Sequence, residues 1–265
     1  MNEIQLIENV LKESVSFVRE QYAKRRNLEV FVKKHENDVL TLVDLAVQED
    51  LVEKIKAEFP TDQIVGEESG LDFLNTTDPP KRCWFIDPID GTQNFLRGQF
   101  PAFGISVGFV KNGVSVAGGV VFPISGDLFT AETGGGAYKN DERISVSTIS
   151  HIPSARIDID FDALQRRETA LHRSTDLILK AGQIRSYSCA VVGFCQVAAG
   201  EQETYLLFGA NSWDIAAGQI IVEEAGGLVT RLDGETLRPF DGKTGAIVAN
   251  RDIHPRILDH LVASG

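Results

Sequence analysis

Two aspartates behind a short apolar segment are the residues of this chain best placed to do chemistry. Asp87 and Asp90 follow the strand-like segment 84–86, and Gly91 and Thr92 come next. Two carboxylates at a strand end are hard oxygen ligands for a divalent cation. A Gly-Thr turn offers free backbone N–H groups to a phosphate. The pattern indicates a cation and a phosphate bound side by side, although an Asp-Pro turn followed by an Asp-Gly turn needs no chemistry.

Two further acidic segments support the chemical interpretation. Residues 66–69, Gly-Glu-Glu-Ser, follow the strand-like segment 63–65, so Glu67 lies at a second strand end. Asp214 stands at the start of an apolar helical pattern over 214–225, where a carboxylate caps free N–H groups and is favoured by the helix dipole. Taken singly, Glu67 can equally be an exposed loop acid and Asp214 an ordinary N-cap.

Together these segments resemble the inositol monophosphatase family of magnesium-dependent, lithium-sensitive phosphatases. The resemblance runs from about Lys33 to about Asn250 and includes the stretch Asp-Val-Leu-Thr-Leu-Val-Asp at 38–44. It implies the family's α/β fold, a layered α-β-α-β-α sandwich of the inositol monophosphatase and fructose-1,6-bisphosphatase type.

The resemblance also assigns metal ligands. It implies two or three Mg²⁺ ions per active site, and the implied ligands are Glu67, Asp87, the backbone carbonyl of Ile89, Asp90 and Asp214. Mg²⁺ keeps several waters, so a few protein ligands suffice.

Catalytic and phosphate-binding roles follow from the same resemblance. Thr92 and Asp44, with help from Glu67, would orient or deprotonate a water whose pKa the cation lowers. The N–H groups of Gly91 and Thr92 would hold the phosphate. Lys33 and Asp38 match positions near a third cation, but they equally fit a solvated charged loop.

The substrate implied is a small phosphorylated polyol or sugar, with inositol 1-phosphate first, and the segment 95–109 is closest to the inositol phosphatase branch. Substrate contacts are expected from Ala190, Leu207 and Asn211. Leu207 stands where inositol-specific members carry a Glu that accepts hydrogen bonds from ring hydroxyls; alternatively it points into the core, and Asn211 or Ser212 meets the alcohol.

Other functions stay open at this point. Fructose 1,6-bisphosphate, histidinol phosphate and a 3′-phosphoadenosine nucleotide are substrates of related members. A non-enzymatic role as a partner of the transcription machinery is the alternative from another class. The family also implies a homodimer.

Composition and net charge limit the classes of partner that this protein is expected to bind. The 265 residues are 43% hydrophobic and 24% charged, as in an ordinary globular protein. A net charge of −12 repels phosphate esters and nucleic acid, so we expect no nucleic-acid partner and a metal as the source of positive charge. No apolar run approaches the roughly 20 residues of a membrane span. Residues 3–22 form an acidic amphipathic helix pattern, not a targeting signal. With three cysteines that lack metal spacing, we expect a cytoplasmic protein.

The segment 150–155, Ser-His-Ile-Pro-Ser-Ala, is the best candidate boundary between two lobes, 1–150 with the Glu-Glu and Asp-Pro-Ile-Asp-Gly-Thr loops and 151–265 with the Trp-Asp helix start. Helices are predicted over 3–22 and 43–58, and an Asn112-Gly113 hairpin turn lies in a β-rich stretch over 103–132. Beyond residue 155, strands and helices alternate.

Asp158, Asp160 and Asp162 lack the Gly and Glu of a calcium loop, and an edge strand with one polar face accounts for them. The five histidines show no ligand spacing and are expected at the surface.

Overall fold

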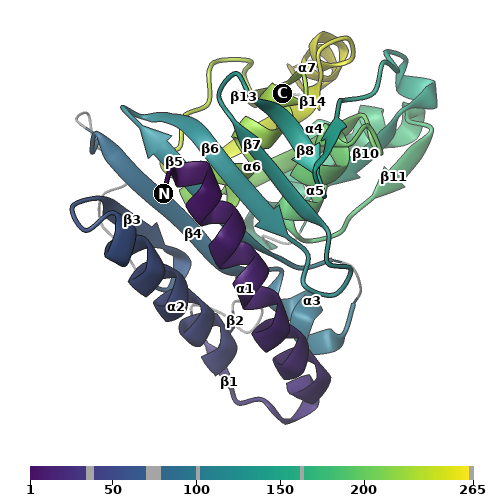
Figure 1. Ribbon diagram of the computed structural model, residues 1–265. Coiled ribbons are helices and arrows are strands. Elements are labelled where there is room, and N and C mark those ends of the chain that lie inside the picture. The colour runs from purple at the N-terminus through teal and green to yellow at the C-terminus, as the bar shows by residue number, and fades with distance from the viewer. Residues whose placement is uncertain (34–38, 70–78, 100–101, 162–163, 263–265) are drawn as a thin grey trace.

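The computed structural model describes residues 1–33, 39–69, 79–99, 102–161 and 164–262. Helices and two β-sheets alternate in five layers, in the order helix, sheet, helix, sheet, helix (Figure 1). Separate hydrophobic clusters fill the spaces between successive layers. The predicted layered sandwich is therefore confirmed.

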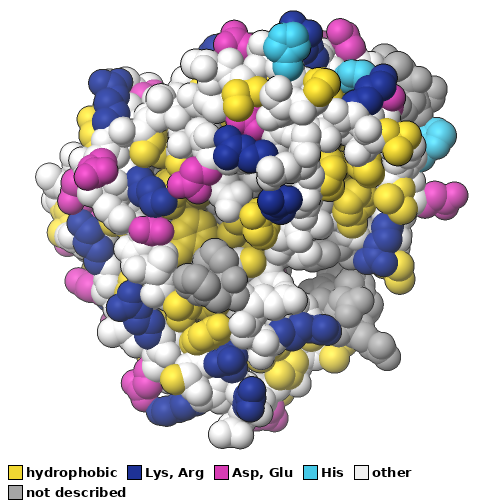
Figure 2. Space-filling view, turned by 90° about the vertical axis from the view of Figure 1, so that its right-hand side faces the viewer, with side chains coloured by type: hydrophobic (Ala, Val, Ile, Leu, Met, Phe, Trp, Pro, Cys, Tyr) yellow, Lys and Arg dark blue, Asp and Glu magenta, His cyan; other side chains and the backbone are white. Residues whose placement is uncertain are grey.

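The exterior mixes charges of both signs. On the face in Figure 2, Lys and Arg side chains are scattered among Asp, Glu and small hydrophobic patches. A nucleic-acid interface typically shows a basic patch or stripe. On the face in Figure 2, the Lys and Arg side chains do not form one. Across the described ranges, no helix combines the length and the apolar character needed to cross a membrane.

The first layer consists of two helices, α1 (Glu3–Lys24) and α2 (Leu42–Glu58). Asn2 caps α1. The apolar stripe predicted for this helix is buried at Ile7, Leu11 and Val18. A short ribbon of β1 (Val30–Val32) and β2 (Val39–Thr41) connects the two helices, after the 3₁₀ turn η1 (Arg25–Asn27). Both helices pack on the larger sheet, because apolar side chains at helical spacing form one continuous face.

Seven strands in sequential order form the larger sheet: β3 (Gln63–Gly66), β4 (Arg82–Asp90), β5 (Gly104–Lys111), β6 (Val114–Val121), β7 (Leu128–Glu132), β8 (Gly136–Lys139) and β9 (Glu142–Ile144). Only the β3–β4 pair is parallel among these neighbours. The predicted hairpin turn is present between β5 and β6: Asn112 and Gly113 have φ of 52° and 80°, which a type I′ turn requires.

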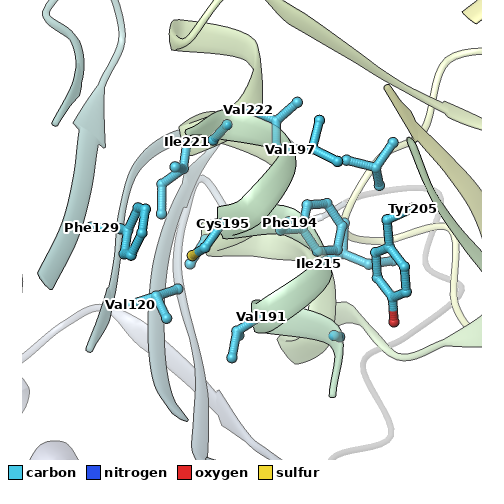
Figure 3. Packing of buried hydrophobic residues seen from close by; sticks show 14 of the residues in the cluster. Val120, Phe129, Val191, Phe194, Cys195, Val197, Tyr205, Ile215, Ile221 and Val222 are labelled. Carbon is cyan, nitrogen blue, oxygen red and sulfur yellow. The ribbon is translucent and has the colours of Figure 1, made fainter. Parts of the chain in front are cut away.

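The central layer is formed by α5 (Ala190–Ala198) and α6 (Ser212–Glu224), and a short helix α3 (Thr92–Arg97) follows β4. Both long helices are buried almost throughout, because each meets a sheet on two sides. Figure 3 shows Phe194 and Tyr205 side by side in this core, with their ring centroids 6.0 Å apart at 76°. This edge-to-face geometry is favourable for aromatic pairs.

Five strands form the second sheet in the order β11-β10-β12-β14-β13, with these bounds: β10 (Arg156–Ile159), β11 (Gln183–Arg185), β12 (Thr204–Ala210), β13 (Gly227–Arg231) and β14 (Thr244–Asn250). The outer layer consists of α4 (Arg167–Lys180) and α7 (His254–Val262). Three 3₁₀ turns complete the chain: η2 (Glu67–Ser69), η3 (Ile152–Ser154) and η4 (Leu164–Arg166).

Two sequence predictions were wrong at this level. The strand that carries Asp158 is not an edge strand: β10 pairs in parallel with both β11 and β12, and Asp158 is buried, where its Oδ1 accepts the N–H of Tyr187 at 3.3 Å. His254 is not at the surface, because its Nε2 packs 2.8 Å from the Thr230 hydroxyl, and burial lowers its pKa. His35 and Asp162 lie outside the described residues. The division into two lobes stays a prediction.

Close contact between β5 and α6 yields a first prediction. A Cβ added at Gly108 would lie 2.7 Å from the Ala216 Cβ and 2.7 Å from the Ala217 backbone nitrogen. Gly108→Ala should therefore force the helix away from the sheet and lower the free energy of unfolding by about 1–3 kcal/mol. Urea denaturation measures the effect. Val114→Ala, at a half-exposed site of the same sheet, is the control and should change stability by at most about 0.5 kcal/mol. Equal stability of both variants would contradict the packing argument.

Candidate active site

Parallel pairing of β3 with β4 brings the first two acidic segments together. Gly66 pairs with Ile86 in the register of these strands. Glu67, which follows β3, and Asp87, near the end of β4, therefore lie at the same end of this strand pair. The carboxyl ends of adjacent parallel strands are a common location for ligand sites in α/β proteins.

A β-bulge in β4 then places a second aspartate beside Asp87. Residues three positions apart on a regular strand point to opposite faces. The pairing of β4 with β5 shifts register between Asp87 and Asp90, where Pro88 has no N–H to offer the ladder. The Ile89 N–H donates instead to Asp87 Oδ1 at 3.1 Å. A bulge of this kind re-aims side chains, and here both carboxylates reach the same cavity.

Gly91 and Thr92 form the start of α3. Gly91 has φ of 86°, and a Cβ there would lie 2.7 Å from the Ala102 carbonyl oxygen, so only glycine fits. The Thr92 Oγ1 lies 3.0 Å from the Ile89 carbonyl oxygen and 3.1 Å from Asp44 Oδ1. The Thr92 hydroxyl and Asp44, which the resemblance assigns to one catalytic pair, are therefore within hydrogen-bond distance of each other.

Asp44 is a buried carboxyl near the start of α2. Its Oδ2 accepts the N–H of Thr41 at 2.9 Å and the Thr41 hydroxyl at 2.5 Å, in a capping box at the helix start. Burial raises the pKa of Asp44; the hydrogen bonds from Thr41 and Thr92 partly offset that rise, and the charge of Glu67 adds to it. A carboxyl whose pKa is raised toward neutrality is suited to accept a proton.

Asp214 reaches the cavity from the start of α6. The helix begins at Ser212, two residues before its predicted start, so Asn211 is the N-cap and Asp214 is the third helical residue. The Asn211 N–H donates to Asp214 Oδ2 at 2.6 Å. This reciprocal capping box holds the carboxylate at the helix start, where it also interacts favourably with the dipole.

A cavity of about 180 Å³ brings these groups together. Its lining residues are Val39, Glu67, Asp87, Ile89, Asp90, Gly91, Thr92, Gln93, Ser188 and Asp214. All residues predicted as metal ligands are among them, and none of the lining residues that the structure describes is Lys or Arg. In the described part of the chain, no three His, Cys, Asp or Glu side chains are grouped closely enough to hold an ion as they stand. The carboxylates thus line the cavity without converging on one point.

Like charges crowd this cavity. Burial raises the pKa of Asp87 well above its ordinary value, and the charges of Glu67, Asp90 and Asp214 raise it further. Burial raises the pKa of Asp90 to about 7. Burial and the charge of Asp90 also raise the pKa of Asp214. A cation would relieve this repulsion, and a set of carboxylates with one backbone carbonyl fits the hard oxygen ligands that Mg²⁺ takes.

Lys33 lies at the edge of the acidic group, just after β1. Its Nζ is 2.9 Å from Glu67 Oε1 and 2.5 Å from Glu68 Oε1. Burial alone would lower the pKa of Lys33, but the charge of Glu67 and the hydrogen bonds to both glutamates raise it overall. Burial raises the pKa of Glu68 to about 7. Asp38, the other residue predicted near a third cation, lies outside the described residues.

The structure does not bring the three predicted substrate contacts onto the cavity wall. Leu207 is only 2% exposed and packs in the core between the two sheets, which is the alternative that the sequence left open. Ala190 is buried at the start of α5. Asn211 is half-buried, with its Nδ2 3.4 Å from Asp214 Oδ2. Leu207 is buried because alternate residues of a strand point to the same face, and Tyr205 and Leu207 on β12 both face the central helices.

Sequence reasoning missed three residues of the cavity wall, namely Val39, Gln93 and Ser188. Gln93 directly follows Thr92, so its position beside the motif was a usable signal. Ser188 had no local signal. It has φ of 58°, and its carbonyl accepts from the Asn94 side chain at 3.3 Å, a contact between segments that are far apart in the sequence.

Comparison with known proteins shows the family to which the chain belongs. The model of the inositol monophosphatase family matches residues 3–265. The chain is 36% identical over 251 residues to the fructose-1,6-bisphosphatase/inositol-1-monophosphatase of Aquifex aeolicus. The aligned region covers 94% of this chain and 88% of that relative. It is 36% identical over 215 residues to the Nus factor SuhB of Pasteurella multocida, and this aligned region covers 80% of this chain and 79% of that relative. The crystal structure of extragenic suppressor protein suhB from Bartonella henselae matches with a TM-score of 0.88 and 28% identity over 97% of each chain.

The fold belongs to the α/β sandwiches of the inositol monophosphatase and fructose-1,6-bisphosphatase type. More narrowly, the chain is a member of the inositol monophosphatase family, a family of phosphatases that act on phosphate monoesters. The relatives carry different names, so similarity alone does not decide among substrates.

The crowded carboxylates yield a prediction about pH. In a chelator such as EDTA, the stability contributed by Asp90 should fall as the pH rises from about 5 to 8. Its folded-state pKa is about 7, against an ordinary value of 3.8. Between these two values the folded state holds a proton that the unfolded state has released, so stability is lost as the pH rises through the folded-state pKa. Melting temperatures at pH 5, 6, 7 and 8 measure the trend.

Asp90→Asn isolates this contribution, because other groups also titrate in the range. The variant removes one titrating carboxyl and one like charge beside Asp87. Its melting temperature in chelator should therefore equal or exceed that of the wild type at pH 8 and change less with pH. Parallel pH profiles for the two proteins would show that Asp90 does not titrate in this window.

Proposed function

We propose that this protein is a Mg²⁺-dependent phosphomonoesterase that hydrolyses small polyol or sugar phosphates, with inositol 1-phosphate as the first candidate. One observation carries the proposal: four carboxylates and the Gly91-Thr92 helix start line a single cavity, and the described residues of its wall include no Lys or Arg. An anionic substrate would be repelled by such a cavity unless cations were bound there. Family membership supplies the phosphatase class.

Glu67, Asp87, Asp90, Asp214 and the carbonyl of Ile89 are the groups that would hold Mg²⁺. When bound, Mg²⁺ neutralises phosphate charge and lowers the pKa of a coordinated water. The protein contributes position: the bulge in β4 and the capping box of α6 fix three of these carboxylates on rigid elements. Sites built on strands and helices hold their side chains more closely than sites on loops.

Thr92 and Asp44 are proposed to handle the proton. The Thr92 hydroxyl, 3.1 Å from Asp44 Oδ1, holds a water for in-line attack on phosphorus. The water oxygen bonds to phosphorus, its proton passes toward Asp44, and the ester P–O bond breaks with its electron pair on the alcohol oxygen. The raised pKa of Asp44, caused first by burial, suits a proton acceptor. The N–H groups of Gly91 and Thr92 would hold the phosphate oxygens.

The alcohol part of the substrate is the least constrained. With Leu207 in the core, no carboxylate occupies the place of the family's inositol-contacting Glu, and the described wall offers Gln93 and Ser188 as polar groups. A wall with few groups aimed at ring hydroxyls discriminates weakly. Phosphate release should be measured across inositol 1-phosphate, fructose 1,6-bisphosphate, histidinol phosphate and 3′-phosphoadenosine 5′-phosphate. We expect inositol 1-phosphate to be hydrolysed with a shallow preference over the others.

Activity should require Mg²⁺, and millimolar Li⁺ should inhibit it. Asp90→Asn should abolish turnover while leaving the fold intact, because it removes one proposed ligand and relieves like-charge crowding. Phosphate release with and without EDTA, and circular dichroism of the variant, are the measurements. Substantial activity in excess EDTA, or full activity of the folded variant, would exclude the proposed mechanism.

Thr92→Val separates proton handling from phosphate binding. The valine keeps the shape and the backbone N–H but removes the hydroxyl, so the turnover number should fall by about 10²–10⁴-fold with little change in the Michaelis constant. Thr130→Val is the control, because Thr130 is buried on β7 and does not line the cavity. A loss confined to the Michaelis constant would assign Thr92 to phosphate binding alone.

A second candidate is a non-enzymatic role in transcription. The observation that favours it is the 36% identity to a protein named Nus factor SuhB. The folded but inactive Asp90→Asn protein distinguishes the two roles. If a cell lacking this gene regains normal growth when it expresses that variant, the role does not depend on catalysis; rescue by the wild type alone supports the enzyme.

A further inference from the structure

A buried hydroxyl without a partner lies next to Asp87. Ser106 on β5 is the register partner of Asp87 on β4, so the two side chains project from the same face of the sheet. Directly opposed residues have Cβ atoms about 4.5–5.5 Å apart. The Ser106 side chain is 0% exposed, and within the described part of the chain its Oγ has no hydrogen-bond partner. An unpaired buried hydroxyl lowers the stability of a folded protein, so its presence needs an explanation.

Packing alone does not explain a serine at this position. Its neighbours on the same face of β5 are Gly104 and Gly108, where a Cβ would come within 2.9 Å of Val191 and 2.7 Å of Ala216. This face is pressed against α5 and α6, so a small residue is required at Ser106 as well. Alanine would meet that requirement without burying a polar atom. The hydroxyl therefore has a reason other than size.

That reason lies in Asp87. The carboxylate of Asp87 accepts a backbone hydrogen bond from Ile89 and is surrounded by the charges of Glu67, Asp90 and Asp214. A hydrogen-bond donor stabilises the ionised form of a carboxylate and fixes its orientation. Groups that orient metal-binding side chains in this way typically change metal affinity by 10–100-fold when removed.

We propose that Ser106 is a positioning residue for the cation site: its hydroxyl donates a hydrogen bond to the Asp87 carboxylate when that group is ionised and holds a divalent cation. Ser106 touches neither substrate nor cation in this proposal and acts only through Asp87. The inference rests on the proposed function, because it assumes that the carboxylates bind Mg²⁺.

The chain offers a matched control in Ser115. This serine lies on β6, the next strand of the same sheet, is 2% exposed, and also has no hydrogen-bond partner among the described residues. It pairs with Val110 and does not neighbour Asp87. Ser106→Ala and Ser115→Ala therefore remove the same kind of buried hydroxyl at two distances from the carboxylates.

The experiment measures the melting temperature of the full chain over a MgCl₂ titration, starting in EDTA. In EDTA, both variants should melt at or above the wild-type temperature, because each loses an unpaired buried hydroxyl. The Mg²⁺ concentration for half-maximal stabilisation should rise about 10–100-fold in Ser106→Ala and change less than about twofold in Ser115→Ala. The Mg²⁺ dependence of phosphate release should shift by the same factor.

The outcomes separate the two proposals. If Mg²⁺ does not stabilise the wild type, the proposed function fails. If Mg²⁺ stabilises the wild type and the two variants respond alike, the role of Ser106 is overturned and the proposed function stands. If Ser106→Ala alone melts earlier in EDTA and its Mg²⁺ response is unchanged, the hydroxyl is structural and the inference is also overturned.

Discussion

Repulsion among four carboxylates in one small cavity is the constraint on which the rest of the site depends. Burial and mutual charge raise the pKa of Asp87 and Asp214 and raise that of Asp90 to about 7. The cluster is stable only with protons or cations nearby, and Lys33 already pairs with Glu67 at its edge. A group of charges that costs stability in isolation is weak evidence for a structural role. The proposed binding of a metal would offset that cost.

The layered fold supplies the rigidity that holds such a cluster together. The carboxylates come from two parallel strands, a bulge and a helix start. Hydrophobic clusters pack against both faces of β3 and β4 and around α6. Glycines at 104 and 108 let α5 and α6 approach β5 closely, and Ala216 of α6 packs in one cluster with Phe85 of β4. The packing energy of the cores thus balances the electrostatic cost of the site.

Chemistry and specificity are separated in this architecture. The acidic groups and the Gly91-Thr92 turn are fixed by the sheet and by short-range hydrogen bonds, and they suit any phosphate monoester. The alcohol would meet a wall that includes Gln93 and Ser188, and Leu207 is turned into the core. This separation is consistent with a family whose members carry several different names.

The sequence by itself determined the features that depend on near neighbours. Periodicity located α1 and α2, and the Asn112-Gly113 pair specified its turn. The acidic motifs, through their resemblance to a known family, singled out Glu67, Asp87, Asp90 and Asp214 as candidate ligands. Long-range contacts decided the rest: the meeting of these segments in one cavity, the inward direction of Leu207, the interior position of β10 and the burial of His254. Local propensity encodes whether a segment forms a strand, but which strands pair, and which face is covered, depends on packing between residues far apart in the chain.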